Sequence, residues 1–557
     1  MRKLITLFAL LFGLIAQAQK ETYTYFIKFR DKNNSIFDIK KPELFLSNKA
    51  ILRRAKFQIK IDETDLPVNE SYIRAVCSRK VKFKNSSKWL NGILVEVEDT
   101  NALLRITDNT YVAYALCVAK YSKQAKVSAE LNAEIGGEPI DVFGENVENS
   151  KSSRQNIYGK AFDQIKMLQG TALHQKKLTG NGVTIAVLDA GYFNANKLPW
   201  FINLQKNHQI LGMHDFVDND TLVFDASDHG LEVLSCMAMV DSGTYIGTAP
   251  LAQYLLLRSE DAETEQLVEE INWSVAAEYA DSIGVDLITT SLGYNTFDDL
   301  NMNHSPSDLD GATSFVTMAA ELAFSKGIVV VCSAGNDGAK AWRKIGFPGD
   351  AHHAITVGAV NLDRAIADFS STGPTADGVS KPDITALGVS SAVASPFGGV
   401  SYADGTSFAT PITAGLVACL IQEHPAKTPQ EIADAVRWSA DRAEIADTFY
   451  GMGIPDFNLA NFILGDSTYD RTKDNLFNIT YNKADHLFCF TIYSATTQVF
   501  GFKLIDDNGN ILKTGSQQCI GRKFKHFYID EMELPEMTKR YGFIVENEAH
   551  QTFIKLF

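Results

Sequence analysis

The stretch DGTSFATPITAGLVACL, residues 404–420, decides the fold of this chain. Its apolar residues, such as Ile412, Leu416 and Leu420, fall on every side of a helix, so the helix has almost no polar face. A helix that is apolar all round is buried in a core. Its N-terminus therefore presents free backbone N–H groups and positive dipole character inside the protein, where Ser407 lies.

The start of this helix can be interpreted in two ways. In one, Thr406 or Ser407 is a plain N-cap. In the other, Ser407 is a reactive hydroxyl, because Gly405 and the small residues around it let a ligand come close. Pro411 fits a first helical turn, where a missing N–H does little harm.

The sequence around this helix predicts an α/β domain over residues 158–465. Nearly continuous apolar runs such as VTIAVLD (183–189) and GIVVVCSAGN (327–336) alternate with amphipathic helical stretches such as residues 264–284. This alternation predicts a parallel sheet covered by helices on both faces. In such sheets functional groups gather where strands end and helices begin.

Four further segments flank this domain. Residues 1–18 have a positive start, a short apolar middle and an A-x-A end, which predicts a secretory signal peptide; the alternative is a buried N-terminal helix. Residues 19–125 predict a small α+β unit, and residues 126–157 an exposed linker. Residues 470–557 contain strand and turn patterns alone and predict a β-sandwich.

The composition excludes several classes of protein. A net charge of −15 over 557 residues repels phosphate backbones, so we expect no nucleic-acid partner. No apolar run after the signal peptide is long enough to span a membrane. The seven cysteines do not form a disulfide scaffold, although Cys77 with Cys117, or Cys489 with Cys519, could bridge. We expect the remaining three to be buried small hydrophobes: Cys236, Cys332 and Cys419.

Three polar residues stand at element ends in the α/β domain. Asp189 ends a buried strand, where a carboxylate is costly unless it is paired; it could instead cap a loop or bind a cation. His229 begins a helical segment, and Gly230 leaves its imidazole open, although such a histidine is often structural. Asn336 follows a strand end, where its amide could donate to a developing oxyanion or simply belong to a turn.

Together these residues form a recognisable pattern. The order Asp, His, Ser, with DAG at 189–191, DHG at 228–230, SAGN at 333–336 and GTSFATP at 405–411, resembles the subtilisin-like serine proteases, or subtilases. The resemblance implies the subtilisin-like fold, with Ser407 as nucleophile and His229 as general base and then acid. It also implies that Asp189 orients the imidazole, and that Asn336 and the Ser407 N–H hold the oxyanion.

The same resemblance implies where a substrate binds. Ser291, Leu292 and Gly293 correspond to the strand edge along which an extended peptide is added. Ala334 and Gly335 correspond to the wall of the pocket for the residue before the cut. No catalytic group is missing from the pattern. At three positions the sequence differs from the commonest family motif, and these differences concern substrate preference and fine geometry: Ala190, Leu231 and Phe408.

The implied function is a secreted or cell-surface serine endopeptidase that acts on proteins or peptides. The α+β unit resembles an inhibitory propeptide, which makes the chain a zymogen, and we expect self-cleavage in the linker near Tyr158. The alternative is a catalytically inactive subtilase fold that binds or adheres. A dinucleotide-binding dehydrogenase is excluded because Gly180 and Gly182 precede the strand that they should follow.

The sequence leaves the cofactor and the role of the C-terminal segment open. No cofactor is expected; calcium sites occur in many subtilases, but no compact run of Asp and Asn ligands identifies one here. The C-terminal segment faintly resembles sorting domains of the bacterial type IX secretion route, and a plain accessory sandwich is the alternative.

Overall fold

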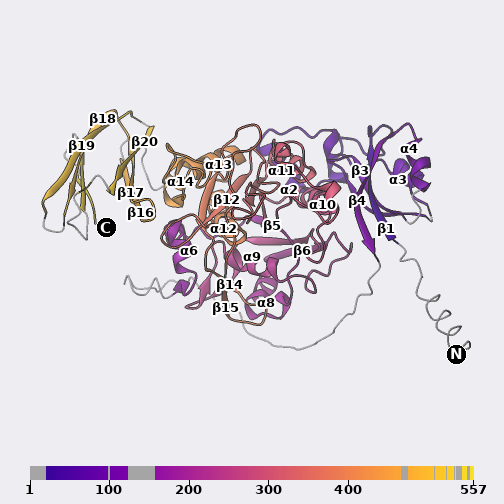
Figure 1. Ribbon diagram of the computed structural model, residues 1–557, viewed down its shortest axis with the longest axis horizontal. Coiled ribbons are helices and arrows are strands. Elements are labelled where there is room, and N and C mark those ends of the chain that lie inside the picture. Colours follow the sequence, from indigo (N-terminus) through magenta and orange to yellow (C-terminus); the bar gives the residue numbers. More distant parts are fainter. Residues whose placement is uncertain are drawn as a thin grey trace, which may run out of the picture.

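A computed structural model describes residues 21–78, 80–97, 101–122, 157–465, 475–506, 509–521, 523–531, 534, 542–547 and 552–556. The predicted signal peptide lies outside these residues, and so does the predicted linker except for its last residue, Ile157. Figure 1 shows an N-terminal unit, a central domain and a C-terminal strand unit that follow one another along the longest axis of the molecule.

The central domain is built on a sheet of seven parallel strands, which confirms the predicted α/β class. Alternate residues of one strand enter opposite cores: Ile185 and Val187 pack on one face, Ala186 and Leu188 on the other. This double burial explains why the strands are continuous apolar runs. In sheet order the strands are β13(Ile384–Leu387), β12(Ile355–Val360), β11(Val329–Ser333), β10(Leu287–Thr290), β5(Thr184–Asp189), β9(Gln253–Arg258) and β6(Ile210–Asp215).

Helices cover both faces of this sheet. On one face lie α9(His229–Ala238), α12(Thr406–Glu423), α13(Pro429–Trp438) and α14(Phe457–Leu464). On the other lie α10(Val268–Ile283) and α11(Phe315–Ser325). The domain also contains three further helices and two small antiparallel pairs: α6(Phe162–Met167), α7(Gly170–Gln175), α8(Pro199–Lys206), β7(Val240–Asp241) with β8(Tyr245–Ile246), and β14(Ser391–Ala394) with β15(Val400–Ala403).

Helix α12 is buried from Thr406 to Leu420, as its apolar surface predicts. Two details of its start differ from expectation. The N-cap is Gly405, so Thr406 and Ser407 already lie inside the helix, and Pro411 lies in the helix interior rather than in the first turn. Proline has no N–H for the carbonyl four residues earlier. That carbonyl, of Ser407, instead accepts a hydrogen bond from Ser291 Oγ at 2.7 Å.

The N-terminal unit is a four-stranded antiparallel sheet with three α-helices, in agreement with the predicted α+β class. Its strands, in the order β2-β3-β1-β4, are β2(Val81–Ser87), β3(Gly92–Val97), β1(Glu21–Phe29) and β4(Val112–Ser122). Its helices are α2(Asn48–Lys56), α3(Glu70–Val76) and α4(Asn101–Thr107).

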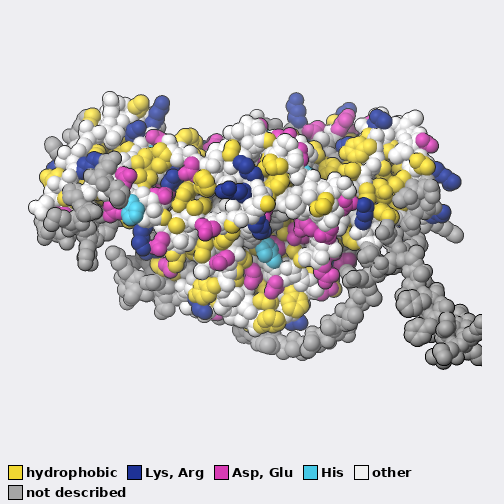
Figure 2. Space-filling view, viewed as in Figure 1, with side chains coloured by type: hydrophobic (Ala, Val, Ile, Leu, Met, Phe, Trp, Pro, Cys, Tyr) yellow, Lys and Arg dark blue, Asp and Glu magenta, His cyan; other side chains and the backbone are white. Residues whose placement is uncertain are grey.

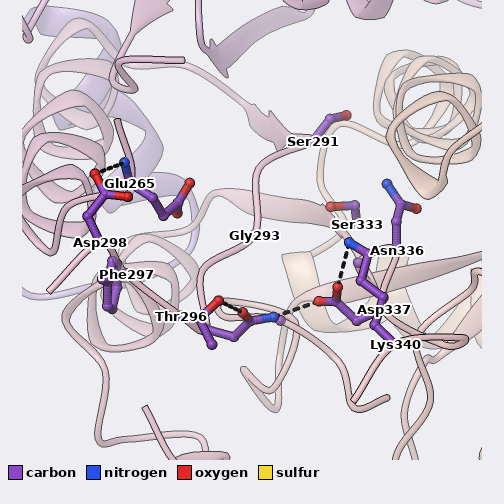
Figure 3. A pocket seen from close by; sticks show the side chains of 13 residues that line it. Glu265, Ser291, Gly293, Thr296, Phe297, Asp298, Ser333, Asn336, Asp337 and Lys340 are labelled. Atoms are coloured by element: carbon purple, nitrogen blue, oxygen red, sulfur yellow. Dashed lines mark hydrogen bonds and ion pairs between the residues drawn. The ribbon is translucent and has the colours of Figure 1, made fainter. Parts of the chain in front are cut away.

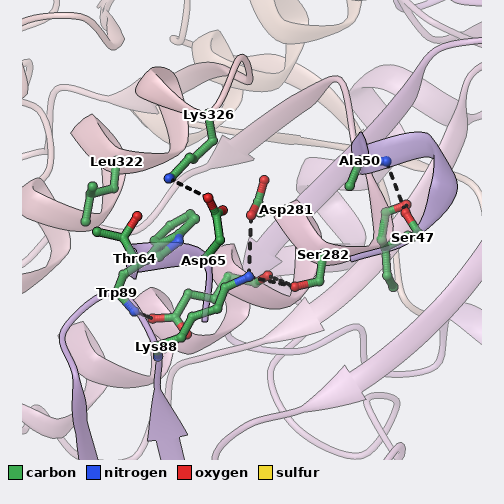
Figure 4. Close-up of polar contacts among 12 residues, drawn as sticks. Ser47, Ala50, Thr64, Asp65, Lys88, Trp89, Asp281, Ser282, Leu322 and Lys326 are labelled. Carbon is green, nitrogen blue, oxygen red and sulfur yellow. Dashed lines mark hydrogen bonds and ion pairs between the residues drawn. The ribbon is translucent and has the colours of Figure 1, made fainter. Parts of the chain in front are cut away.

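The turn between β2 and β3 is held by one carboxylate of the central domain. Glu278 of α10 accepts backbone hydrogen bonds from Lys88 at 2.7 Å and Trp89 at 3.1 Å, and a third from the Ser87 hydroxyl. Three donors from the N-terminal unit thus meet one buried acceptor. Figure 4 shows Lys88 and Trp89 of this turn, and the Lys88 side chain bonded to Asp281 and Ser282 of α10.

Buried ion pairs join the same two units. Arg54 of α2 lies between Asp65 at 2.9 Å and Asp281 at 3.0 Å, and Asp65 also accepts from Lys326 at 3.0 Å. Arg53 contacts Asp281 at 2.5 Å. All five side chains are at most 4% exposed, so each charge depends on its partners instead of on water. We call this set the interface ion network.

The C-terminal unit is a sandwich of two antiparallel sheets around one aromatic core, as predicted. One sheet contains β16(Leu476–Asn482), β17(Leu487–Ser494) and β20(Lys523–Asp530). The other contains β19(Ile511–Cys519), β18(Gln498–Ile505), β21(Gly542–Asn547) and β22(Thr552–Leu556). Lys483 pairs with Asp363 of the central domain at 2.7 Å, and Tyr528 Oη accepts from the Glu444 N–H at 3.1 Å.

All seven cysteines are free, so neither candidate disulfide forms. Cys489 and Cys519 lie on strands of different sheets, and Cys77 follows α3 whereas Cys117 lies within β4. The three central cysteines are buried, as expected. Among the described residues, no helix combines the length and apolar character needed to cross a bilayer.

We expect the interface ion network to hold the N-terminal unit in place. Arg54→Gln should destabilise its docking by about 3–5 kcal/mol, because two buried carboxylates each lose a partner. Lys49→Gln, on the same helix, removes a half-exposed pair with Asp286 and should cost less than about 1 kcal/mol. Hydrogen exchange of the α2 amides, in chains that also carry Ser407→Ala, measures both; equal losses would contradict the prediction.

Candidate active site

The four residues predicted to act together come from one edge of the central sheet. Asp189 is the last residue of β5, and His229 is the first of α9. Ser407 lies in the first turn of α12, and Asn336 follows the end of β11. This is the edge where parallel strands end and helices begin, and where sites of α/β domains form.

Asp189 and His229 form a direct pair. His229 Nδ1 lies 2.7 Å from Asp189 Oδ1, which also accepts from the Ala190 N–H at 2.8 Å. The carboxylate is fully buried, whereas the imidazole is 30% exposed, so its second nitrogen remains accessible. Gly230 makes this approach possible, because a Cβ there would stand 2.4 Å from the Gly191 carbonyl oxygen.

Ser407 lies at the buried start of α12. The next residue, Phe408, lies beside His229, with ring centroids 6.2 Å apart. Ser407 Oγ donates to the carbonyl oxygen of Ser291 at 3.3 Å, and within the described part of the chain no hydrogen bond links it to His229. Catalytic hydrogen bonds often tighten only when substrate binds, so the hydroxyl would turn from the carbonyl to the imidazole.

Asn336 is oriented by Thr406. Its Oδ1 accepts from both the N–H and the hydroxyl of Thr406, each at 3.0 Å, which leaves the side-chain NH₂ to point elsewhere. A Cβ built on Gly405 would lie 3.5 Å from the Ser407 nitrogen and 3.6 Å from Asn336 Nδ2. Two N–H donors therefore border the same small space beside Gly405, as an oxyanion site requires.

Three of the five predicted substrate-binding residues line a common pocket of about 440 Å³. Ser291, Gly293 and Gly335 border it together with Asn336 (Figure 3). Leu292 and Ala334 do not, because both side chains are buried in the core beneath the sheet edge. The pocket thus adjoins the proposed oxyanion site.

The same pocket has acidic walls that the sequence analysis missed. Glu265, Asp298 and Asp337 line it, and Lys340 pairs with Asp337 at 2.9 Å. The signal was SEDAETE, residues 259–265, a run of carboxylates directly after β9. Its path into the cleft could not be inferred from periodicity.

Nearby carboxylates set the basicity of His229. Burial of the imidazole lowers its pKa, but Asp189 outweighs burial, and Glu260 and Glu232 add to it, so the pKa rises to about 9. A neutral imidazole, the form that accepts a proton, is thus favoured at alkaline pH.

No metal site can be assigned. In the ranges that the structure describes, no three His, Cys, Asp or Glu side chains are grouped so as to hold a metal ion. Calcium binding therefore stays an unassigned expectation.

Comparisons with known proteins give a consistent result. A family profile described as "Subtilase family" matches residues 180–453, and one described as "Peptidase S8 propeptide domain, Bacteroidota" matches residues 24–133. Serine protease AprX of Bacillus subtilis is 33% identical over 50% of this chain and 65% of its own length. Subtilisin E of the same organism is 30% identical over 52% of this chain and 68% of its own length.

A solved structure is also similar. The crystal structure of MycP1 from the ESX-1 type VII secretion system is 22% identical, with a TM-score of 0.44, over 55% of this chain and 87% of that one.

The raised pKa of His229 predicts how Ser407 reacts with a fluorophosphonate. The labelling rate should rise with pH and reach half its maximum near pH 9, because the imidazole must lose its proton before it can act as a base. Asp189→Asn should slow labelling and move the midpoint to lower pH. Mass spectrometry of processed protein measures the rate, and a wild-type midpoint near the ordinary histidine value would contradict the assignment.

Proposed function

The chain belongs to the subtilase family of serine endopeptidases, and on that premise we propose that it hydrolyses peptide bonds of proteins through an acyl-enzyme formed on Ser407. The observation that carries the proposal is the buried Asp189–His229 hydrogen bond beside the enclosed start of α12. That arrangement supplies a base next to a hydroxyl, in a pocket with N–H donors.

Acylation follows from these positions. His229 Nε2 takes the proton of Ser407 Oγ as the oxygen attacks the peptide carbonyl carbon. Asp189 holds the opposite ring nitrogen, which fixes the tautomer and stabilises the imidazolium. The carbonyl oxygen gains negative charge and is met by the Ser407 N–H and the Asn336 NH₂. His229 then returns the proton to the leaving amine as the C–N bond breaks.

Deacylation repeats the sequence with water. Water gives a proton to His229 and attacks the ester carbon, and the oxyanion occupies the same donors. The ester C–O bond then breaks, and the proton returns to Ser407, which leaves a free carboxylic acid and the starting enzyme. The low exposure of Ser407, 7%, supports this chemistry because electrostatic interactions are stronger where water is scarce.

The N-terminal unit is proposed to be the inhibitor of its own enzyme. The propeptide profile supports this role, and so does the interface ion network, which holds the unit against α10 and α11. The last described residues of the unit, at the end of β4, lie at the rim of the cleft, where Lys120 pairs with Asp299 at 2.5 Å. We propose that residues 1–18 direct secretion and that residues 126–157 contain the processing site.

Two further expectations concern an inactive binding protein and the role of the C-terminal sandwich. All four catalytic positions are filled and the matched relatives are named proteases, so nothing favours an inactive binding or adhesion protein. The C-terminal sandwich is proposed as a secretion or sorting domain, with an accessory domain as the alternative. Its contacts with the central domain, such as Lys483 with Asp363, are compatible with both.

The catalytic assignment predicts two graded losses. Ser407→Ala should abolish casein hydrolysis and fluorophosphonate labelling, because the nucleophile is gone. Asn336→Leu should keep labelling but lower kcat by about 10²–10³, because one oxyanion donor is lost. Ser325→Ala, at an exposed helix end, is the control for expression and folding. Hydrolysis that persists in Ser407→Ala would refute the assignment.

Self-processing predicts the N-terminus of the secreted product. Edman sequencing of active wild-type enzyme should show a start within or just after the linker, near Tyr158, whereas the Ser407→Ala chain should keep its N-terminal unit. Active wild-type enzyme that begins at Gln19 would rule out the proposed zymogen.

A further inference from the structure

The substrate cleft has an acidic side that catalysis does not require. In Figure 3 the pocket is bordered on one side by Ser333, Asn336 and Asp337 and on the other by Glu265 and Asp298, with Gly293 between. The Glu265 carboxylate points into the pocket, and the Asp298 N–H donates to the Glu265 carbonyl at 2.8 Å, which holds the two residues together. Figure 2 shows acidic side chains gathered on the central domain next to the N-terminal unit.

These carboxylates have no cationic partner. In the described ranges, no Lys, Arg or His forms an ion pair with Glu260, Glu265 or Asp298, whereas Asp299 and Asp337 each have one. Beneath them Glu269 is 1% exposed, and its Oε1 has no hydrogen-bond partner.

Burial and mutual repulsion both disfavour the charged forms of these carboxyl groups. Burial first, and then Asp298, raises the pKa of Glu265 to about 7; burial and then Glu265 raise that of Glu260 to about 8. Burial, Glu260 and Glu265 raise the pKa of Glu269 to about 10. Asp298 accepts hydrogen bonds from Gln266 Nε2 at 3.0 Å and the Glu265 N–H at 3.3 Å, but neither donor is an ion-pair partner. A positive charge placed among these carboxylates would relieve the repulsion and supply the missing cation.

The chain's own N-terminal unit already brings a cation to this side of the cleft. Lys120 near the end of β4 pairs with Asp299, and it borders a hollow that also includes Asp298. Tyr121 packs against the core that contains Leu292 and Phe297. Residues 120–122 precede any cut between the N-terminal unit and the central domain. A segment on the N-terminal side of the cut thus contacts this acidic side.

We infer that the processed enzyme has an acidic subsite, built from Glu265 and Asp298 with Glu260 behind them, that binds a lysine or arginine side chain of the substrate on the N-terminal side of the scissile bond. The inference rests on the proposed endopeptidase function. It specifies a substrate class, basic peptides, that the catalytic residues leave open.

Matched peptides test the subsite. Internally quenched peptides carry arginine, or its neutral isostere citrulline, at each of the four positions before the cut. Wild-type processed enzyme, titrated by fluorophosphonate, should cleave the arginine peptide with a kcat/KM about tenfold higher at one of these positions. Glu265→Gln should reduce that ratio to about twofold or less.

Two further variants complete the design. Glu263→Gln, an exposed carboxylate on the same loop, should keep the full arginine preference. Glu265→Lys should reverse it, so that a glutamate peptide becomes the better substrate at the same position. If Glu265→Gln titrates poorly, Asp298→Asn serves in its place, because Asp298 is exposed and tolerates the change.

The outcomes separate the two proposals. Peptide cleavage with no arginine preference at any position, or a preference that survives in Glu265→Gln and Asp298→Asn, overturns the subsite alone. So does a preference for tyrosine over both residues, which would assign the pocket to an aromatic side chain as presented by Tyr121. Failure of both fluorophosphonate labelling and peptide cleavage would overturn the proposed function and the subsite with it.

Discussion

A helix with no polar face has to be enclosed on every side, and the arrangement of the central domain follows from the enclosure of α12. The sheet covers one side of it, and α9, α13 and α14 cover the others. Its first turn is therefore a set of N–H groups inside the protein. Pro411 frees the Ser407 carbonyl, and Ser291 takes it, so the helix start is tied to the strand edge along which a peptide would lie. A packing requirement thereby positions a reactive group.

Charge compensation at this edge connects stability with chemistry. Asp189 is tolerated without water because Ala190 and His229 donate to it, and the same contacts fix the imidazole. Within the described ranges, Glu260 and Glu265 of SEDAETE form no ion pair, and this difference separates a carboxylate that orients the imidazole from carboxylates that can bind a cation. Asp189 and Glu260 both raise the pKa of His229, so the acidic side of the cleft also affects the basicity of the imidazole.

The sequence predicted most of the architecture because its main signals are local. Continuous apolar runs identified the strands, and the apolar surface of α12 identified the buried helix. The DAG, DHG, SAGN and GTSFATP patterns pointed to Asp189, His229, Asn336 and Ser407. The misses involve contacts between distant residues. Glu265 enters the cleft on a loop whose path leaves no periodic signal. Leu292 and Ala334 have side chains in the core, and their part in substrate binding stays a prediction. In the sequence, Arg54 belongs to an ordinary basic helix. Its ion pair with Asp281, far along the chain, could not be inferred from local pattern.

The interface ion network has a consequence for how latency ends. Its charged side chains share partners, so removal of one leaves the others buried without a counter-charge. A partly dissociated N-terminal unit is therefore less stable than either the fully docked or the fully released unit. If the N-terminal unit inhibits the enzyme as proposed, most molecules are then either fully inhibited or fully released. The time of activation would be set by cleavage of the linker rather than by gradual loosening of the interface. Release of the N-terminal unit exposes Asp281 and Lys326 to water. Because these side chains are then hydrated, rebinding of the unit is less favourable.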